Sequence, residues 1–280
     1  MTRRAAWALA WFAAGAAPTS PPHGLLRSVS APELVRYGPF AMRYVVHRDL
    51  HIEQSFGGPP QSQTLGARVF LTATIVGPAD SAGYPTTFIV DSVVADSGAP
   101  APVSESAAKV RALVLTGRLE RGGEFRGTRA SDSALAVAPV PSVLLGSFRD
   151  FLPRIPREGA QLGVAWTDTL SITLHAGGAD VTRRAVVASK ATAWESHSDA
   201  RSLRIETQGA FTVAGSGANN GQPFAVTGSG TTSGHAFLAE DGRFLGGESW
   251  DSTALTVSLP VQSLTIPVTQ ILHSSVAVLP

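Results

Sequence analysis

The chain has 280 residues, no cysteine, and nearly equal numbers of basic and acidic residues, 22 against 21. Because the charges are balanced and form no block of one sign, the sequence offers no electrostatic field for nucleic acid or for an acidic substrate. The lack of cysteine excludes a disulfide framework and a thiol nucleophile. The 28 glycines and 19 prolines, with abundant Ser, Thr and Val, favour sheet and turns over long helices.

The first residues have the features of a secretory signal peptide. Arg3 and Arg4 precede an uncharged, largely apolar run over 5–17, which contains the small residues Ala14-Gly15-Ala16. This run is shorter than the roughly 20 residues that a membrane-spanning helix needs. We therefore predict a signal peptide over 1–16, a flexible leader over 17–29, and no transmembrane helix after cleavage. The alternative is an uncleaved membrane anchor.

Arginine far outnumbers lysine, which occurs only at Lys109 and Lys190. This usage is typical of a GC-rich bacterium, so we expect an exported bacterial protein of the periplasm or the extracellular space.

Residues 30–280 are predicted to form one β-rich domain. The predicted domain begins with a capping box at Ser30–Glu33, which indicates a short helix ending near Gly38-Pro39. Further short helices are expected over 104–115 and 143–152. Extended runs with strand character cover 41–53, 67–76, 86–94, 117–137, 166–175, 184–196, 202–213, 223–238, 243–259 and 262–278.

Two of these regions are related to each other. Residues 117–137 and 234–257 share Leu, Gly, Phe, Gly, Asp and Ser at positions that differ by 119 in number. Each is predicted to be a hairpin that closes one half of the domain, with halves of about 30–138 and 160–280 joined by a helix-turn segment. In the second hairpin, Asp241-Gly242 suits a type I′ turn, which requires positive φ at both central residues.

The fold class expected from these runs is mainly β, with some helix. About 10–11 strands would form a single large curved antiparallel sheet, or incomplete barrel, with two or three short helices. The clearest alternation is over 203–213, where Leu203, Ile205 and Phe211 share one face, while Arg204 and Glu206 share the other. One face of the sheet is therefore expected to be apolar and the other solvated.

No catalytic, cofactor or metal motif stands out. No Gly-x-Ser-x-Gly, Walker or dinucleotide-binding pattern is present, so we predict a non-enzymatic protein without a cofactor. Five carboxylates are candidates for glycosidic cleavage only in a loose sense: Asp168, Glu206, Glu240, Glu248 and Asp251.

Two groups of histidines and acids invite a metal interpretation. His47 and His51 have the spacing of a helical zinc pair, but on a strand they would be roughly 13 Å apart. Glu195, His197 and Asp199 fit a solvated hairpin tip better than a metal site. We predict no metal site.

Large aromatic residues are the candidate ligand-binding residues. Three tryptophans remain after the predicted signal peptide, at Trp166, Trp194 and Trp250. Tryptophan in a β-rich chain most often fills a core. The more specific prediction is that these three line an apolar cavity together with Phe148 and Phe151.

The segment 151–159, FLPRIPREG, followed by Trp166 at the start of a strand, resembles a pattern of exported bacterial β proteins. The order of a signal peptide, long antiparallel strands and a few short helices resembles the LolA/LppX-like periplasmic lipoprotein-carrier superfamily. The resemblance implies an incomplete barrel whose concave apolar face, covered by helices, holds acyl chains. This chain lacks the lipid-attachment cysteine of the mycobacterial lipoprotein members, and no ligand residue transfers from the family by position.

The expected function is the binding of an apolar or amphiphilic, lipid-like ligand on the concave face of the sheet. Two alternatives remain open from the sequence. One is an outer-membrane β-barrel, because strand alternation is common to both classes. The other is a structural or protein-interaction module of the bacterial envelope, with a fully packed interior.

Overall fold

The computed structural model describes residues 33–55, 58–96, 105, 107–132, 151–176, 179–219 and 221–280. Residues Glu33–Pro280 form one compact unit. The predicted signal peptide and leader lie outside the described residues, as do Phe148 and most of the helix expected over 143–152.

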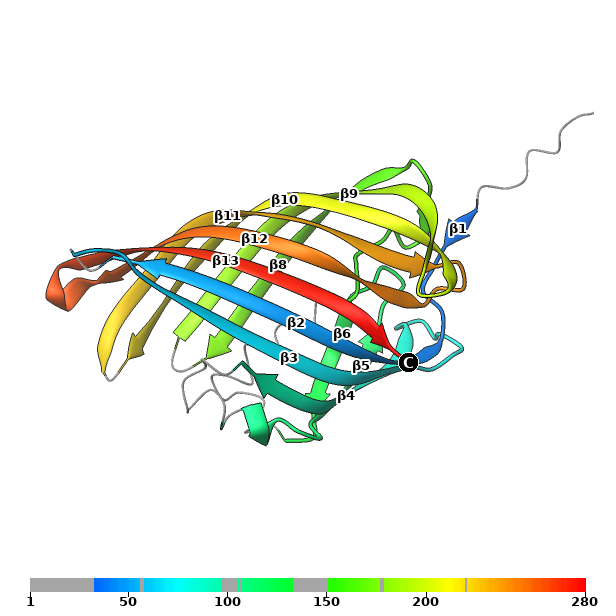
Figure 1. The fold of residues 1–280 in the computed structure, drawn as a ribbon, viewed down its shortest axis with the longest axis horizontal. Helices are drawn as coiled ribbons and strands as arrows, with labels where there is room; N and C mark the ends of the chain where they lie inside the picture. Colours follow the sequence, from blue (N-terminus) through cyan, green and yellow to red (C-terminus); the bar gives the residue numbers. More distant parts are fainter. Residues whose placement is uncertain are drawn as a thin grey trace, which may run out of the picture. The chain divides into compact units, whose positions relative to one another are not determined.

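The unit is built almost entirely from β-strands (Figure 1). In chain order the elements are β1 (Leu34–Val35), β2 (Phe40–Gln54), β3 (Gln61–Ile75), β4 (Tyr84–Ala95), β5 (Val114–Leu119), β6 (Phe125–Ala130), β7 (Ala160–Gln161), β8 (Ala165–Ala176), β9 (Ala179–His197), β10 (Ala200–Asn219), β11 (Gln222–Ala239), β12 (Phe244–Leu259), the 3₁₀ turn η1 (Pro260–Gln262) and β13 (Leu264–Leu279). Ten of the predicted runs thus coincide with strands or, at 117–137, with a hairpin.

Eleven strands form one antiparallel sheet in the order β6-β5-β4-β3-β2-β13-β12-β11-β10-β9-β8. The chain enters in the middle of the sheet and builds outward from β2 to β6. It then crosses to the opposite edge and returns from β8 to β13, which pairs with β2 from Arg43↔Leu279 to Gln54↔Val268. In Figure 1 the red strand β13 accordingly lies beside the blue strand β2. The sheet is not closed, because β6 and β8 are its two edges. The prediction of a single large, open antiparallel sheet is confirmed.

The sheet is strongly curved. Leu115 on β5 and Ala191 on β9 belong to the same buried cluster, although eight strand spacings separate these strands. In a flat sheet that separation would be about 38 Å, at ~4.8 Å per strand. Residues from both halves can meet only if their common face is concave. We call this face, which carries Tyr44, Leu203 and Ile205, the concave face, and the opposite one the convex face.

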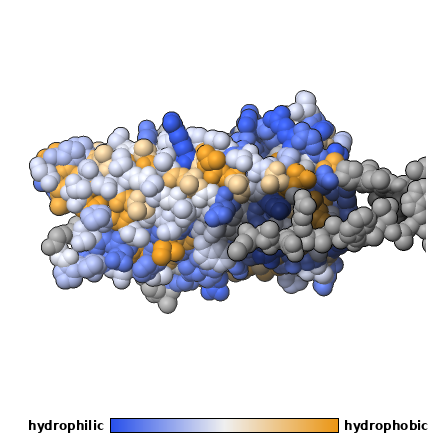
Figure 2. Space-filling view, turned by 90° about the horizontal axis from the view of Figure 1, so that it is seen from above, coloured by the Kyte–Doolittle hydropathy of each residue, from blue (hydrophilic) through white to orange (hydrophobic). Residues whose placement is uncertain are grey.

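Strand alternation follows the sequence pattern. On β10, Leu203, Ile205 and Phe211 are buried, whereas Glu206 and Thr212, on the convex face, are exposed. The pleat places successive side chains on opposite faces, so the apolar series fills the concave face, as predicted. Figure 2 shows one side of the unit as a mosaic of hydrophilic and apolar side chains, with the hydrophilic ones densest toward the end where β1 lies.

The two related hairpins have the same geometry. Leu119 pairs with Phe125 and Leu238 with Phe244, and Gly123 and Gly242 have φ of 89° and 88°. The Gly242 N–H donates to the Ala239 carbonyl at 2.9 Å, and the Gly123 N–H donates to the Glu120 carbonyl at 3.0 Å.

These contacts correct the predicted turn type. Asp241 is not among the residues with positive φ, so the loop is not type I′. Glu240 and Asp241 form the centre of a three-residue loop, and Gly242 provides the left-handed position that follows it. A true two-residue loop with positive φ at both positions joins β9 to β10 instead, at Ser198 (48°) and Asp199 (58°). Glu195 and His197 lie at the end of β9, next to this hairpin tip.

In the described parts of the chain, the predicted helices are mostly not found. Leu34–Val35 is not helical but pairs with Ala160–Gln161 as a small ladder, because the extended backbone finds a partner there. Of the helix expected over 104–115, only a turn at Glu105 and Ala107–Lys109 is helical in the described part. The valine- and leucine-rich end of that segment joins the sheet as β5. Two or three short helices are thus not confirmed.

Among the described residues, none of the helical segments has both the length and the apolar character required to span a bilayer.

Candidate ligand-binding cavity

One end of the concave face is filled by aromatic side chains. The ring of Phe151 packs edge-on against Tyr44, Phe88 and Phe244, with ring centroids 5.1–5.6 Å apart. Phe88 makes the same kind of contact with Phe125 at 5.0 Å. Edge-to-face pairs are favourable beyond the area that they bury. Phe151 therefore packs the segment 151–157, which we call the crossing segment, against both halves of the sheet.

Two buried tyrosine hydroxyls fix this end. The Tyr44 hydroxyl donates to the Phe244 carbonyl at 2.7 Å, and the Tyr37 hydroxyl donates to the Pro153 carbonyl at 2.6 Å. Burial raises the pKa of both phenols well above their usual range, because the phenolate would lose its hydration. Both groups therefore act as neutral donors that hold the chain, not as acids.

Beside the aromatic cluster lies a cavity of about 190 Å³. Its apolar lining comes from strands of both halves and from the crossing segment: Val46, Val69, Phe151, Pro153, Ala236, Phe244 and Val276. Arg48, Thr207, Ser249 and Ser274 add polar atoms to the wall. Mostly apolar walls with a few polar groups are characteristic of small-molecule sites.

The polar residues reach the cavity because of strand register. Arg48 on β2 pairs with Ser274 on β13, which pairs with Ser249 on β12. Directly paired residues point to the same face, so the three side chains form a polar row across the concave face. The lining also includes His235 and Glu248, so Arg48 is one of three ionisable residues around the cavity.

The concave face continues beyond the cavity toward the far ends of the strands. There it carries Leu50, Ile52, Val213, Leu255 and Leu272, all half-buried. A cavity of about 190 Å³ is smaller than the roughly 300–1,000 Å³ of typical ligand pockets. A ligand with a long acyl chain would therefore also need the apolar surface that continues beyond the cavity.

Of the five predicted binding residues the structure describes four, Phe151, Trp166, Trp194 and Trp250, and these four do not lie together. Trp166 and Trp194 pack against the concave-face core with Phe151. The Trp166 indole N–H donates to the Arg154 carbonyl at 3.1 Å, and the Arg201 guanidinium lies 3.9 Å from the centre of the Trp194 ring. Of these three, Phe151 lines the cavity.

Trp250 lies on the convex face. It pairs with His273, and their rings stack with centroids 4.9 Å apart. Phe148 lies outside the described residues. The strand residues that line the cavity are not predictable from the sequence, because only the pairing of β2 with β13 shows which of their side chains share a face with Phe151.

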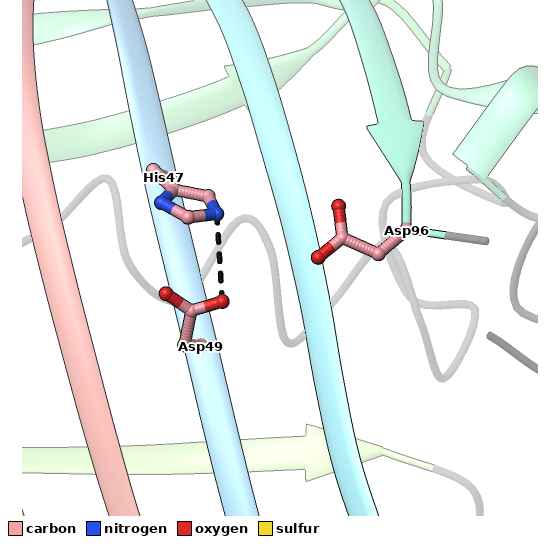
Figure 3. A group of neighbouring side chains, drawn as sticks. All are labelled: His47, Asp49 and Asp96. Carbon is pink, nitrogen blue, oxygen red and sulfur yellow. Dashed lines mark ion pairs between the residues drawn. The ribbon is translucent and has the colours of Figure 1, made fainter. Parts of the chain in front are cut away.

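The two histidines of HRDLH are on one strand, β2. His51 bonds the Thr64 hydroxyl at 3.1 Å. His47 lies near two carboxylates on the convex face, those of Asp49 and Asp96 (Figure 3).

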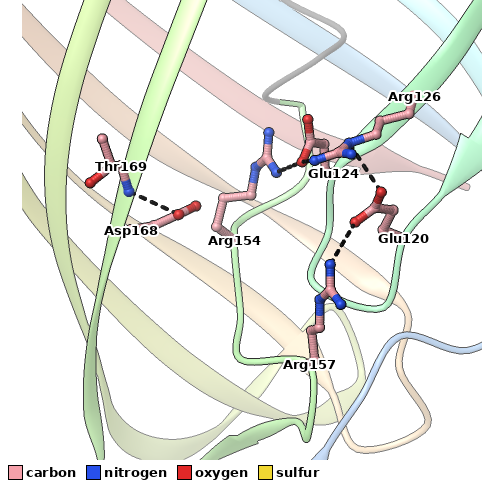
Figure 4. Close-up of polar contacts among 7 residues, drawn as sticks. All are labelled: Glu120, Glu124, Arg126, Arg154, Arg157, Asp168 and Thr169. Atoms are coloured by element: carbon pink, nitrogen blue, oxygen red, sulfur yellow. Dashed lines mark hydrogen bonds and ion pairs between the residues drawn. The ribbon is translucent and has the colours of Figure 1, made fainter.

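A second, polar cavity of about 560 Å³ lies between the β5–β6 hairpin, the segment 154–157 and β8. Figure 4 shows an ion-pair network in its wall. Arg126 bonds Glu124 at 2.7 Å and Glu120 at 3.0 Å, while Arg154 bonds Glu124 at 3.0 Å. The hydrogen bond from Arg126, with a further one from Arg154, lowers the pKa of Glu124.

The crossing segment bridges the gap between the two edge strands at this end. The Ile155 N–H donates to the Gly122 carbonyl at 3.1 Å on the β6 side, and the Arg154 carbonyl accepts from Trp166 on the β8 side. The polar cavity thus lies at the gap between the two edge strands, and its ion pairs join the β5–β6 hairpin to Arg154 and Arg157 of the crossing segment.

Four of the five loosely proposed carboxylates make ion pairs or hydrogen bonds. Asp251 pairs with Arg183 at 3.0 Å, Glu240 with Arg201 at 2.9 Å and Glu206 with Arg204 at 3.2 Å. Asp168 accepts the Thr169 N–H at 2.8 Å, and the backbone of Glu248 lies opposite His235 in the β11–β12 ladder.

No protein-family model matches this chain, and a search of curated proteins finds no significant relative.

Proposed function

We propose that this protein is an exported, non-enzymatic binding protein for an apolar or amphiphilic, lipid-like ligand, held on the concave face of the sheet. The observation that carries the proposal is the largely apolar cavity beside Phe151, on a concave face whose strands also carry half-buried aliphatic residues. Covering an apolar surface of this kind with a ligand lowers the free energy by about 25 cal/mol per Å² of buried area.

The composition of the cavity wall favours an amphiphile over a plain hydrocarbon. Arg48, Thr207 and Ser274 offer a charge and hydroxyl groups among apolar neighbours. A ligand with both an acyl chain and a polar or anionic head would use both parts of the wall. The signal-peptide pattern and the resemblance to periplasmic lipoprotein carriers support an exported location and the same ligand class.

A second candidate is a structural or protein-interaction module. The observation that favours it is the aromatic cluster around Phe151, which fills one end of the concave face with the protein's own side chains. A module of this kind would need no ligand.

Binding can be tested with two matched variants on one strand. Thr207 on β10 lines the cavity, whereas Thr212 on the same strand is exposed on the convex face. We expect Thr207→Phe to weaken binding of a fluorescent fatty-acid analogue at least tenfold, because the ring occupies the cavity. Thr212→Phe should bind like the unaltered chain. The measurement is a fluorescence titration, with circular dichroism to verify that both variants fold.

Equal binding by both variants would place the ligand elsewhere. If the unaltered chain binds neither the fatty-acid analogue nor a fluorescent lysophospholipid, the carrier proposal fails and the interaction module is favoured.

A further inference from the structure

Three metal-binding side chains converge on the convex face, away from the proposed lipid cavity. His47 and Asp49 are two residues apart on β2, so the pleat directs both to the convex face. Asp96 directly follows β4 and reaches the same place across β3 (Figure 3). One ligand atom from each residue lies within 4.8 Å of the other two.

A glycine makes this approach possible. Gly66 on β3 pairs with Asp49, and its carbonyl accepts the Asp96 N–H at 2.9 Å. A Cβ at this position would collide with the Asp96 carboxylate and would lie 3.1 Å from Oδ1 of Asp49. A side chain at position 66 would therefore displace the Asp96 carboxylate from its present place.

The spacing of the donors fits a metal ion. Nε2 of His47 is 3.4 Å from Oδ1 of Asp49. Two ligands of a tetrahedral zinc ion, each at about 2.0–2.1 Å, are ~3.3 Å apart. The pair thus has the separation of two zinc ligands, and the Asp96 carboxylate, within 4.8 Å of both, must move closer to bind the same ion.

We propose that His47, Asp49 and Asp96 form a binding site for a divalent transition-metal ion, with Zn²⁺ as the best match. An imidazole nitrogen with two carboxylates suits zinc and its neighbours in the first transition row, whereas Mg²⁺ and Ca²⁺ prefer oxygen-only sets. Three protein ligands leave a coordination position for water. Beyond the ligands, Nδ1 of His273 lies 3.9 Å from the second oxygen of Asp49, where it can orient that carboxylate.

A nearby cation is the competing explanation for the two carboxylates. Arg68 on β3 pairs with His47 and is exposed on the same face. Its guanidinium is flexible enough to neutralise the acids without a metal. The experiment must therefore show a metal stoichiometry and not only a structural role for the acids.

The test is isothermal titration of the full chain, free of any affinity tag, with ZnCl₂ and separately with MgCl₂. We expect one zinc ion per chain and no measurable magnesium binding. His47→Ala and Asp96→Asn should each weaken zinc binding at least tenfold. Gly66→Ala should weaken it too, because the methyl group displaces Asp96, although all three ligands remain. With Co²⁺ in place of zinc, visible absorption should appear and be lost in His47→Ala.

His51→Ala is the matched control, because this histidine is on the same strand but bonds Thr64 and is not among the three ligands. It should retain zinc binding within about twofold. The proposal is overturned if no zinc binds, if His51→Ala lowers the affinity as much as His47→Ala, or if Gly66→Ala binds zinc like the unaltered chain. Since the site is on the opposite face from the cavity, its failure would leave the lipid proposal intact.

Discussion

At the residue scale, burial raises the pKa of two phenols, those of Tyr37 and Tyr44, and so keeps them protonated. Tyr44 donates to the backbone of β12 from a fully enclosed position. Since the surroundings cannot solvate a phenolate, the hydroxyl stays protonated and serves as a fixed link between β2 and β12. Tyr44 is thus both a core residue and a hydrogen-bond donor across the sheet.

This arrangement predicts a loss of stability in alkali. The pKa of Tyr44 in the folded protein is above the value of about 10 that it has in the unfolded chain. The folded state therefore holds its proton more tightly. The free energy of unfolding should be unaffected by this group below about pH 10 and should fall above it, by up to ~1.4 kcal/mol per pH unit.

Urea denaturation at several pH values between 8 and 11 measures this effect. Tyr44→Phe should be less stable by about 1–2 kcal/mol at pH 8, because the hydrogen bond is lost. Its alkaline decline should be shallower than that of the unaltered chain. Parallel declines would show that Tyr44 does not resist ionisation.

Glycine at hairpin turns illustrates what a residue pattern can and cannot predict. The sequence correctly indicates turns at Gly123 and Gly242, because positive φ is inexpensive there. It does not indicate that a Cβ at Gly242 would collide with the carbonyl of Arg36, which is about 200 positions earlier in the chain. The first property is local, whereas the second depends on tertiary contact.

At the element scale, alternation makes most strands predictable. The runs that form β2, β4 and β8–β13 show an apolar face, β-branched residues and flanking turn residues, all of which are local signals. Helices are overpredicted for the opposite reason. A capping box favours a helix only when no better partner exists, and at Leu34–Val35 the backbone pairs with β7.

One ion pair is direct evidence that the sheet is curved. Arg183 on β9 and Asp251 on β12 are 3.0 Å apart, although β10 and β11 lie between these strands and a flat sheet would separate them by about 14 Å. The guanidinium also covers the ring of Phe211, at 3.9 Å from its centre. The pair therefore spans the concave side of the sheet.

We predict a measurable coupling between these two residues. In a double-mutant cycle with Arg183→Met and Asp251→Asn, the interaction energy should be about 1–2 kcal/mol, more than for a typical exposed pair. Urea unfolding of the four chains gives this number. A coupling near zero would indicate that the two side chains are apart in solution and that the sheet is more open there.

At the scale of the whole molecule, strand order decides which residues can form a site, and local sequence signals do not predict strand order. The central β2–β13 pairing joins the two ends of the unit, and nothing local indicates it. For this reason the sequence pattern groups Trp250 with Trp166 and Trp194, whereas register puts it on the convex face beside His273.

Because strand order is not predictable from local sequence, neither proposed site can be predicted from the sequence alone. The polar row Arg48–Ser274–Ser249 needs three strands from opposite ends of the chain. The set of His47, Asp49 and Asp96 needs a glycine on an intervening strand. Composition and spacing correctly suggest an open curved sheet, but the chemistry on each face is a product of the pairing.

The central claim is that the concave face holds a lipid-like ligand, and native mass spectrometry of the purified chain tests it most directly. We expect an additional mass of a lipid or fatty acid that is retained under gentle ionisation, is released by organic solvent, and is much reduced in Thr207→Phe but not in Thr212→Phe. If several independent preparations show only the mass of the bare chain, even after incubation with a bacterial lipid extract, the claim is contradicted.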